Sequence, residues 1–515
     1  MALVRNRTGR LVTALSLTAA TALVATMLSF SASPAGAEDV VHPLSFGATV
    51  VLPQSGSTGS ASSTCYNPCG EPSMIVGPDN TVYVSTPRTL LVCCNSKSSP
   101  VWKSTDGGTT WSNPIFPSAP AAQANAFTGG DTQLAVDKRG VVYEGELWLG
   151  SDSMYISGDK GATWSWSPVS HDVLDDREWL VYAEKEDAIY GIYDAIKGLE
   201  VIKIPLTTPL GSDAARVAPI ERLAVPEWND CPGILAGPCV GKPSQIPDEV
   251  NGVPVLAGLT SPGRPAVDQR DGTVYFPFPY QVAGKGIGIA VTTDGINFQY
   301  RYVTGAGRGS FGDTGNDFPV AAVDAAGNLY IAWSEKKGSD STIYLSTSKD
   351  KGVTWSGPFA VSDGVSGTAI FPNIVAGAPG RVAVSWFGSP DVGDPNAMPN
   401  AVWDVDAAVT LDALDAQPTF DVAAVKTQFH KGNICTHGSG CTSDDRKLLD
   451  FFDMQLDRTN GALLVVYARD KAGHPGATGT DIAFNRQTDG CSLTQPGVYL
   501  GPGTPASPGT PPTSC

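Results

Sequence analysis

The chain has 515 residues, including 57 glycines and 40 prolines, and a formal net charge of −17 at pH 7. This acidity argues against nucleic acid or an anionic lipid surface as a partner. The glycine and proline content, with few segments of helical period, predicts many short strands joined by turns within one large all-β domain.

Residues 1–37 have the pattern of a secretory signal peptide, which predicts a secreted, extracellular protein. The pattern consists of three basic residues, an apolar stretch and an A-x-A cleavage site: Arg5, Arg7 and Arg10, then Leu11 to Phe30, then Ala35-Gly36-Ala37. We expect the mature chain to begin at Glu38 and to have no membrane span after signal cleavage. The apolar stretch is long enough to cross a bilayer, so an uncleaved anchor is the alternative.

An eight-residue pattern, S-x-D-x-G-x-T-W, occurs at residues 104–111, 157–164 and 348–355. Its aspartate can accept hydrogen bonds from the backbone amides that follow, its glycine can take a positive φ, and its tryptophan can pack beneath the turn. This pattern is an Asp-box, and it resembles the repeat of bacterial sialidases and related β-propellers. The resemblance implies four-stranded antiparallel blades, with Asp106, Asp159 and Asp350 as structural residues on the face opposite the funnel.

A longer unit surrounds each Asp-box, and the segment from Asp131 to Tyr143 matches the segment from Phe318 to Tyr330 position for position. Weaker copies begin near Glu71, Glu178, Arg264, Phe371 and Asp450. Seven units predict seven blades, with six, as in sialidases, or eight as the alternatives. We expect residues 40–52 to form a strand that completes the last blade.

The propeller is predicted to span residues 38–495 with a proline-rich insertion at 207–261, followed by an extended tail at 496–515 that is rich in proline and glycine. Ten cysteines in an exported chain predict disulfides between near neighbours. We expect the pairs 231–239, 435–441 and 491–515, with Cys65, Cys69, Cys93 and Cys94 paired among themselves. A zinc site formed by those four cysteines is the alternative.

The candidate site follows from blade geometry, because first strands start and second strands end on the same face and line the funnel. Carboxylates there can act as acid, base or nucleophile, aromatic rings can stack on sugars, and arginines can bind acidic substituents. The candidate catalytic residues are Asp131, Glu178 and Asp317, and the candidate substrate-binding residues are Arg88, Trp148, Arg177, Arg264, Tyr280 and Arg469. The histidines show no spacing of metal ligands, and no metal or cofactor is expected. A calcium ion held by Asp313, Asn316 and Asp317 is the alternative to solvated loop acids there. A solvated channel mouth is the alternative explanation for this ring of polar residues.

The resemblance implies a sialidase-like glycoside hydrolase that removes acidic sugars from extracellular glycans or glycoconjugates, acting as a monomer. Sialidases carry an arginine trio, a tyrosine nucleophile paired with a glutamate, an acid/base aspartate and an Arg-Ile-Pro motif. This chain has no Arg-Ile-Pro, and Arg264-Pro265 is the nearest match. Only a suitable curvature would bring Arg88, Arg264 and Arg469 together as a trio. A non-catalytic propeller that binds a glycan or a protein on its funnel face is therefore the alternative function.

Overall fold

Short antiparallel strands form nearly all of the regular structure in the computed structural model. It describes residues 40–53, 70–87, 98–117, 130–148, 151–168, 176–195, 198–206, 242–245, 249–250, 253–254, 262–280, 286–303, 314, 317–437, 441, 446–471, 480–505 and 514–515. Within these ranges the one helix is a 3-10 turn, η3 (Pro395–Ala397), and no helix could cross a membrane. The all-β class is therefore confirmed for the described residues, whereas the predicted signal peptide lies outside them.

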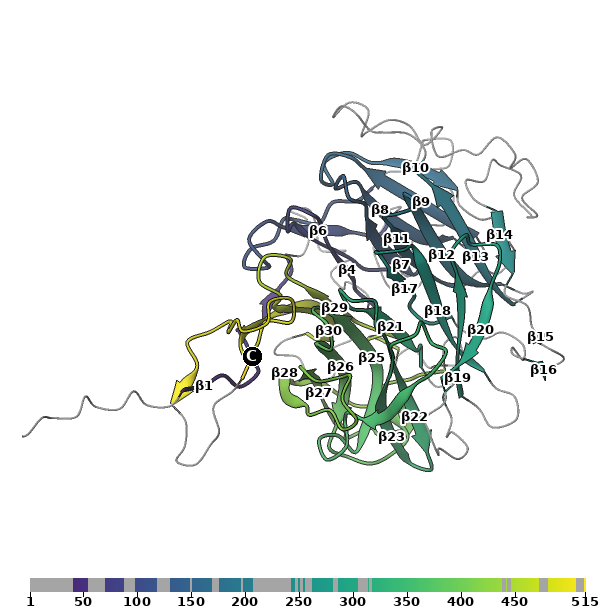
Figure 1. Ribbon diagram of the computed structural model, residues 1–515. Coiled ribbons are helices and arrows are strands. Elements are labelled where there is room, and N and C mark those ends of the chain that lie inside the picture. Colours follow the sequence, from purple (N-terminus) through teal and green to yellow (C-terminus); the bar gives the residue numbers. More distant parts are fainter. Residues whose placement is uncertain are drawn as a thin grey trace, which may run out of the picture. The chain divides into compact units, whose positions relative to one another are not determined.

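The strands follow one another as antiparallel groups, which we number along the chain (Figure 1). The first group holds β4 (Ser73–Val76), β5 (Val82–Ser85) and β6 (Val101–Ser104), and the second holds β7 (Thr132–Val136), β8 (Val142–Trp148), β9 (Ser151–Ser157) and β10 (Ser165–Pro168). The third holds β11 (Asp176–Ala183), β12 (Ala188–Ala195), β13 (Gly198–Pro205) and β14 (Lys242–Gln245), and the fourth holds β17 (Ala266–Asp268), β18 (Thr273–Tyr280), β19 (Gly286–Thr292) and β20 (Gln299–Tyr302).

Two further groups share one sheet, because β23 and β25 meet in a single parallel pairing of Ser341 with Thr368. The fifth group holds β21 (Val320–Val323), β22 (Leu329–Lys337), β23 (Asp340–Ser348) and β24 (Ser356–Ala360), and the sixth holds β25 (Thr368–Ala376), β26 (Val382–Ser389), β27 (Val402–Thr410) and β28 (Asp421–Lys431). The seventh holds β29 (Asp453–Leu456), β30 (Leu463–Asp470) and β31 (Thr480–Asp489). A small hairpin pairs β15 (Glu249–Val250) with β16 (Val253–Pro254).

The first strands of these groups pack against one another in a closed order. β4 contacts β7, and the contacts continue through β11, β17, β21, β25 and β29, which returns to β4. A closed order of antiparallel groups is the arrangement of a β-propeller. Each predicted unit start lies at or near the first strand of one of these groups.

The matched units fold alike because an aspartate and a tyrosine hold the first hairpin of each. In the second group the Asp137 carboxylate accepts hydrogen bonds from the backbone amides of Arg139 and Val141 and from the Tyr143 hydroxyl. In the fifth group Asp324 accepts the Tyr330 hydroxyl in the same way. The second-strand tyrosines are fully buried and pack between neighbouring groups: Tyr83, Tyr143, Tyr190, Tyr275, Tyr330 and Tyr467.

The three S-x-D-x-G-x-T-W segments form the same turn after the third strand of their groups. In the second group Asp159 Oδ1 accepts the Thr163 amide at 2.8 Å, and Trp164 Nε1 donates to the Gly161 carbonyl. The glycines of the three turns have φ angles of 92°, 80° and 87°. These turns lie beside first-strand ends, since Lys160 pairs with Asp79, just after β4. The predicted turn geometry and its separation from the first-strand starts are confirmed.

The N-terminal segment completes the seventh group, as predicted. β2 (Ser45–Phe46) and β3 (Val50–Val51) both pair with β31, antiparallel to it. Leu44 and Leu52 are buried in the largest apolar core, alongside residues of the first, sixth and seventh groups. One end of the chain therefore closes the group formed by the other end.

Two segments differ from their predictions. The proline-rich region contributes β14, which pairs with β13 as the outer strand of the third group. The tail folds back instead of extending: β32 (Thr504–Pro505) pairs with β1 (Val40–Val41), and His42 stacks on Tyr499 at 4.1 Å. Proline and glycine content predicted neither pairing, because the partners lie far away in the sequence.

Two of the expected disulfides are present. Cys435 bonds to Cys441 and Cys491 to Cys515, with Cα–Cα distances of 5.8 and 5.3 Å. Cys65, Cys69, Cys93, Cys94, Cys231 and Cys239 lie outside the described residues.

Candidate functional site

The starts of the first strands carry unusual backbone. Glu71, Arg177, Phe371 and Leu449 have φ angles of 51°, 54°, 55° and 60°, and none of them is glycine. Arg177 and Phe371 also lie where the strand register shifts, between Asp176 and Trp179 in β11 and between Ile370 and Asn373 in β25. Left-handed residues and bulges store strain and redirect side chains, and both are frequent at functional sites.

The Arg177 guanidinium is at the centre of this region. It is 3% exposed and lies between the rings of Trp179 and Phe451, with its Cζ atom 4.1 Å from each ring centroid. Its Nη2 donates to the Glu178 carbonyl at 3.0 Å, whereas Nε and Nη1 make no hydrogen bond. A buried cation between two rings is held rigidly.

Two carboxylates approach the same guanidinium nitrogen. Arg177 Nη1 is 3.3 Å from Asp131 Oδ2 and 3.9 Å from Glu71 Oε2. Asp131 Oδ2 and Glu71 Oε2 therefore cannot lie further apart than the sum of these distances, an upper limit that is compatible with the spacing of about 5–9.5 Å found for carboxylate pairs in glycoside hydrolases. The Asp131 side chain is 23% exposed, whereas Glu71 is buried.

Glu71 is connected to the seventh group. Its Oε1 accepts the backbone amide of Asp450 at 2.8 Å, and the Asp450 carboxylate forms an ion pair with Arg446. Burial raises the pKa of Glu71 well above its ordinary value, and the nearby Asp131 and Asp450 carboxylates raise it further. Glu71 therefore holds a proton more readily than an ordinary glutamate, and Asp450 is paired with Arg446.

Asp317 is the second buried acid of the region. Its Oδ2 accepts the backbone amide of Phe371 at 3.1 Å, and its Oδ1 is buried without a hydrogen-bond partner. Burial, with a smaller contribution from Asp450, raises the pKa of Asp317 to about 7. Such a group can give or take a proton near neutral pH. We name Glu71, Asp131, Arg177, Asp317, Arg446 and Asp450 the central cluster.

Arg264 lies beside this cluster but has a carboxylate of its own. Its Nη1 and Nη2 donate to the two oxygens of Asp453 at 2.6 and 3.1 Å, and Asp453 Oδ2 also accepts the Met74 amide. The Arg264 Cζ is 5.9 Å from the Trp179 ring over which Arg177 also lies. Arg177 and Arg264 thus both lie near the Trp179 ring, and Asp453 balances the charge of Arg264.

The other predicted residues are less close to the cluster. A Cβ atom added at Gly145, in the second group, would lie 3.5 Å from Glu178 Cγ. The Glu178 side chain therefore packs toward that neighbouring group. Arg469 Nη2 is 3.8 Å from Asp481 Oδ2, in the seventh group. Arg88 and the side chains of Trp148 and Tyr280 lie outside what the structure describes.

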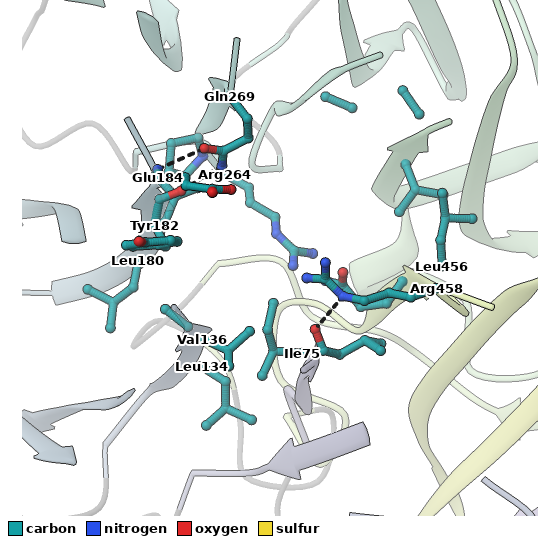
Figure 2. Close-up of a pocket in the computed structure, with 18 of the residues that line it drawn as sticks. Ile75, Leu134, Val136, Leu180, Tyr182, Glu184, Arg264, Gln269, Leu456 and Arg458 are labelled. Carbon is teal, nitrogen blue, oxygen red and sulfur yellow. Dashed lines mark hydrogen bonds between the residues drawn. The ribbon is translucent and has the colours of Figure 1, made fainter. Parts of the chain in front are cut away.

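A cavity of about 590 Å³ begins at Arg264 and is lined by residues at or in the first strand of every group. Figure 2 shows the Arg264 side chain extending into it, with Ile75, Leu180 and Leu456 on its walls. The other end of the cavity is polar. There the backbone amide of Glu184 donates to the side-chain oxygen of Gln269, and Arg458 Nε donates to the Val76 carbonyl. The cavity is the central channel, and Arg264 marks its boundary with the cluster.

Sequence reasoning did not single out Arg446, and it placed Glu71 and Asp450 in the polar ring without assigning them a role. The signal available in the sequence for Arg446 was a group of charged residues just before the predicted unit start at Asp450. Among the described residues, no group of three or more His, Cys, Asp or Glu side chains could hold a metal ion. The chemistry available to the cluster is therefore proton transfer and the binding of an anionic group.

No family model and no curated protein matches the sequence. Among solved structures, the chain is similar to the GH93 α-L-arabinofuranosidase of Fusarium graminearum, solved with arabinobiose (13% identity, 85% of this chain and 97% of that chain, TM-score 0.43). It is also similar to a PL25 ulvan lyase (12%, 81% and 93%, 0.45) and to the intramolecular trans-sialidase of Ruminococcus gnavus (12%, 83% and 96%, 0.41). At such identities and TM-scores the likeness carries no conclusion about activity, and function must be argued from the residues of this chain.

Proposed function

We propose that this chain is a secreted, seven-bladed β-propeller that hydrolyses an acidic extracellular glycan at the central cluster, as a sialidase-like exo-glycosidase. The closed order of seven first strands supports the blade number. The two described disulfides agree with an exported protein. The observation that carries the activity is the presence of two kinds of carboxyl group in the central cluster: Asp131, partly exposed and beside Arg177, and Asp317, buried with a pKa of about 7.

The two aspartates divide the chemistry in this proposal. Asp317 donates a proton to the leaving oxygen, because its raised pKa of about 7 lets it give up a proton near neutral pH. Asp131 activates water or attacks the sugar, because it is the more exposed acid. The substrate's acidic group binds near Arg177 and Arg264, the two guanidinium groups that share Trp179.

Sialidase-type specificity is the most detailed claim in the proposal. It requires a third arginine, and Arg88 and Arg469 are the candidates from the sequence. Arg469 contacts Asp481, so a substrate carboxylate would have to compete with that pairing. Glu178 stays in the proposal as a positioning residue, because its carbonyl accepts a hydrogen bond from Arg177 Nη2.

A panel of fluorogenic sialosides, uronides and neutral glycosides tests the activity. We expect cleavage of an acidic member by the wild type and a loss of at least about a hundredfold in kcat for Asp131→Asn and Asp317→Asn, since a positioned acid or base contributes about 10²–10⁴-fold. Asp406→Asn is the matched control, because burial also raises the pKa of Asp406 to about 7 while its partner, Ser366, lies outside the cluster. Equal losses in all three variants would contradict the assignment.

A binding module is the second candidate, and one observation favours it. Cations in and beside the cluster are paired with the protein's own carboxylates, as in the Arg264–Asp453 and Arg446–Asp450 pairs. Such pairs can hold a rigid recognition surface without chemistry. Glycan binding measured by calorimetry, with no cleavage of any panel member, would decide for this candidate.

A further inference from the structure

A second set of buried acids lies between the first and second groups, and none of them belongs to the central cluster. Glu144 and Glu146 are two residues apart on β8, so their side chains leave the same face of the sheet. Both are fully buried. On the adjoining strand β7, Thr132 pairs with Glu146 in the antiparallel register, which places the Thr132 hydroxyl on that same face, beside the Glu146 carboxyl.

The face that carries these residues packs on the first group. Ser85 Oγ donates to Glu144 Oε1 at 2.6 Å, and the backbone amide of Ser99 donates to Glu146 Oε1. Residues of both groups form an apolar cluster next to this polar set: Tyr83, Val101, Leu134, Val136 and Val142. Two carboxyl groups are therefore enclosed between two sheets, with protein on every side that the structure describes.

Two oxygens of this set are buried without a hydrogen-bond partner: Glu144 Oε2 and Thr132 Oγ1. Burial raises the pKa of Glu144 well above its ordinary value, and the neighbouring Glu146 raises it further. Unpartnered buried oxygens are costly, and two enclosed carboxylates repel each other unless a proton or a cation lies between them. The two oxygens belong to neighbouring strands, so one bound species could satisfy both.

We propose that a calcium ion binds between the first and second groups, with the carboxylates of Glu144 and Glu146 and the hydroxyl of Thr132 among its ligands. Calcium is a hard cation that takes six to eight oxygen ligands in flexible geometry, including neutral oxygens. The set has two carboxylates and no third acidic, imidazole or thiol ligand among the described residues, so hydroxyl and carbonyl oxygens complete the shell. One divalent ion would also balance the two negative charges that the fold encloses.

Other common cations fit less well. Zinc prefers nitrogen and sulfur ligands in tetrahedral sites, and the side chains of this set, Glu144, Glu146, Thr132 and Ser85, offer oxygen only. Magnesium usually keeps several waters, for which a set enclosed between two sheets leaves little access. The ion's role would be structural, because every side chain in the set is buried and none belongs to the central cluster.

Thermal unfolding with and without calcium tests the site. Protein stripped with EGTA is compared with the same protein in about 2 mM CaCl₂, a concentration that suits the affinity of extracellular calcium modules. We expect calcium to raise the Tm of the wild type by about 2 °C or more. The double variant Glu144→Gln/Glu146→Gln should not respond, whereas the control Glu184→Gln, which changes an exposed carboxylate, should respond like the wild type.

Metal content gives a readout that does not depend on stability. The wild type and the control should carry about one calcium per chain by elemental mass spectrometry after brief dialysis, and the double variant should carry none. No calcium effect on the wild type, or a rise in Tm that the double variant retains, would overturn the proposal. A calcium-independent Tm that falls as the pH rises in the wild type, but less steeply in the double variant, would show instead that the pair holds a proton.

Discussion

The residues around Arg177 show how a buried cation can be prepared for a ligand before any ligand is bound. Its guanidinium is fixed by two aromatic rings and one carbonyl, and its remaining N–H groups face Asp131 and Glu71. A flexible surface arginine loses rotamer freedom when it binds an anion, whereas this one has already lost it during folding. The left-handed backbone at Arg177 is part of that arrangement, because it turns the side chain out of the regular strand pattern.

Asp317 and Asp406 predict how stability depends on pH. The pKa of each is raised to about 7, compared with about 3.9 in an unfolded chain. Between about pH 4 and pH 7 the folded protein therefore binds protons that the unfolded chain has released, and the free energy of unfolding falls as the pH rises through this window. Asparagine at either position cannot bind this proton, so the free energy of unfolding of each variant should depend less on pH.

Denaturant titrations of the wild type, Asp317→Asn and Asp406→Asn at pH 5 and pH 8 measure this effect. Relative to the wild type, each variant should gain on the order of 2–4 kcal/mol between pH 5 and pH 8. Both amides can keep their present hydrogen bonds through the side-chain oxygen, to the Phe371 amide and to the Ser366 hydroxyl. A wild type whose stability rises between pH 5 and pH 8, unchanged by either variant, would contradict the burial of these acids.

At the scale of elements, the S-x-D-x-G-x-T-W turn is a structural motif that recurs at residues 104–111, 157–164 and 348–355. In the second group Asp159 accepts hydrogen bonds from the Thr163 amide, the Thr163 hydroxyl and the Ser157 hydroxyl. Although burial opposes it, these bonds lower the pKa of Asp159, so the turn keeps its charged acceptor well below neutral pH. The turn therefore needs an aspartate, since a shorter or neutral side chain makes fewer and weaker bonds.

Replacement of Asp159 by alanine should lower the free energy of unfolding by about 1–3 kcal/mol, because three hydrogen bonds lose their acceptor. Any activity of the folded fraction should stay at the wild-type level, since the turn is beside first-strand ends and the central cluster is at first-strand starts. Asp363→Ala, at an exposed position, is the control and should change stability by less than about 0.5 kcal/mol. Loss of activity in a folded Asp159→Ala protein would contradict the structural role.

Several elements were predictable from the sequence because they repeat. The unit from Asp131 to Tyr143 contains its own aspartate and tyrosine contact, so its match at Phe318 to Tyr330 predicted a second hairpin of the same kind. The bulge in β11 was not predictable, because alternation has a period of two and an inserted residue leaves no mark in it. That bulge separates Arg177 from Glu178, which the sequence had placed together in the site.

Pairings between distant segments also escaped prediction. β14 lies within a proline-rich region, and only its pairing with β13 shows that it is a strand. The central cluster draws Glu71, Asp131, Arg177, Asp317 and Asp450 from different groups. Their sequence positions relative to the unit starts indicated the shared face, but not which of them are buried, and burial is what raises the pKa of Glu71 and Asp317.

At the scale of the unit that spans residues 40–515, the two ends of the chain cooperate to close the ring. The C-terminal loop is joined by the Cys491–Cys515 disulfide, and Arg381 of the sixth group donates to the carbonyls of Ser492 and Cys515. The N-terminal segment supplies β2 and β3 to the seventh group, and the Leu44 amide donates to Asp421 in the sixth. β2 and β3 cover the edge of β31, which protects that strand from pairing with another chain.

Leu52 and Val51 test whether this closure stabilises the whole unit. Leu52 is 3% exposed within the largest core, whereas its neighbour Val51 is 38% exposed. Leu52→Ala should lower the free energy of unfolding by about 2–5 kcal/mol, and Val51→Ala should change it by less than about 0.5 kcal/mol. If the ring unfolds as one unit, tryptophan fluorescence and far-UV circular dichroism should give coincident transitions in both variants, because losing the terminal strand exposes β31 and loosens both neighbouring groups. A Leu52→Ala protein in which the N-terminal segment detaches while the rest unfolds at the wild-type midpoint would show instead that the strand is an accessory to a ring that is stable without it.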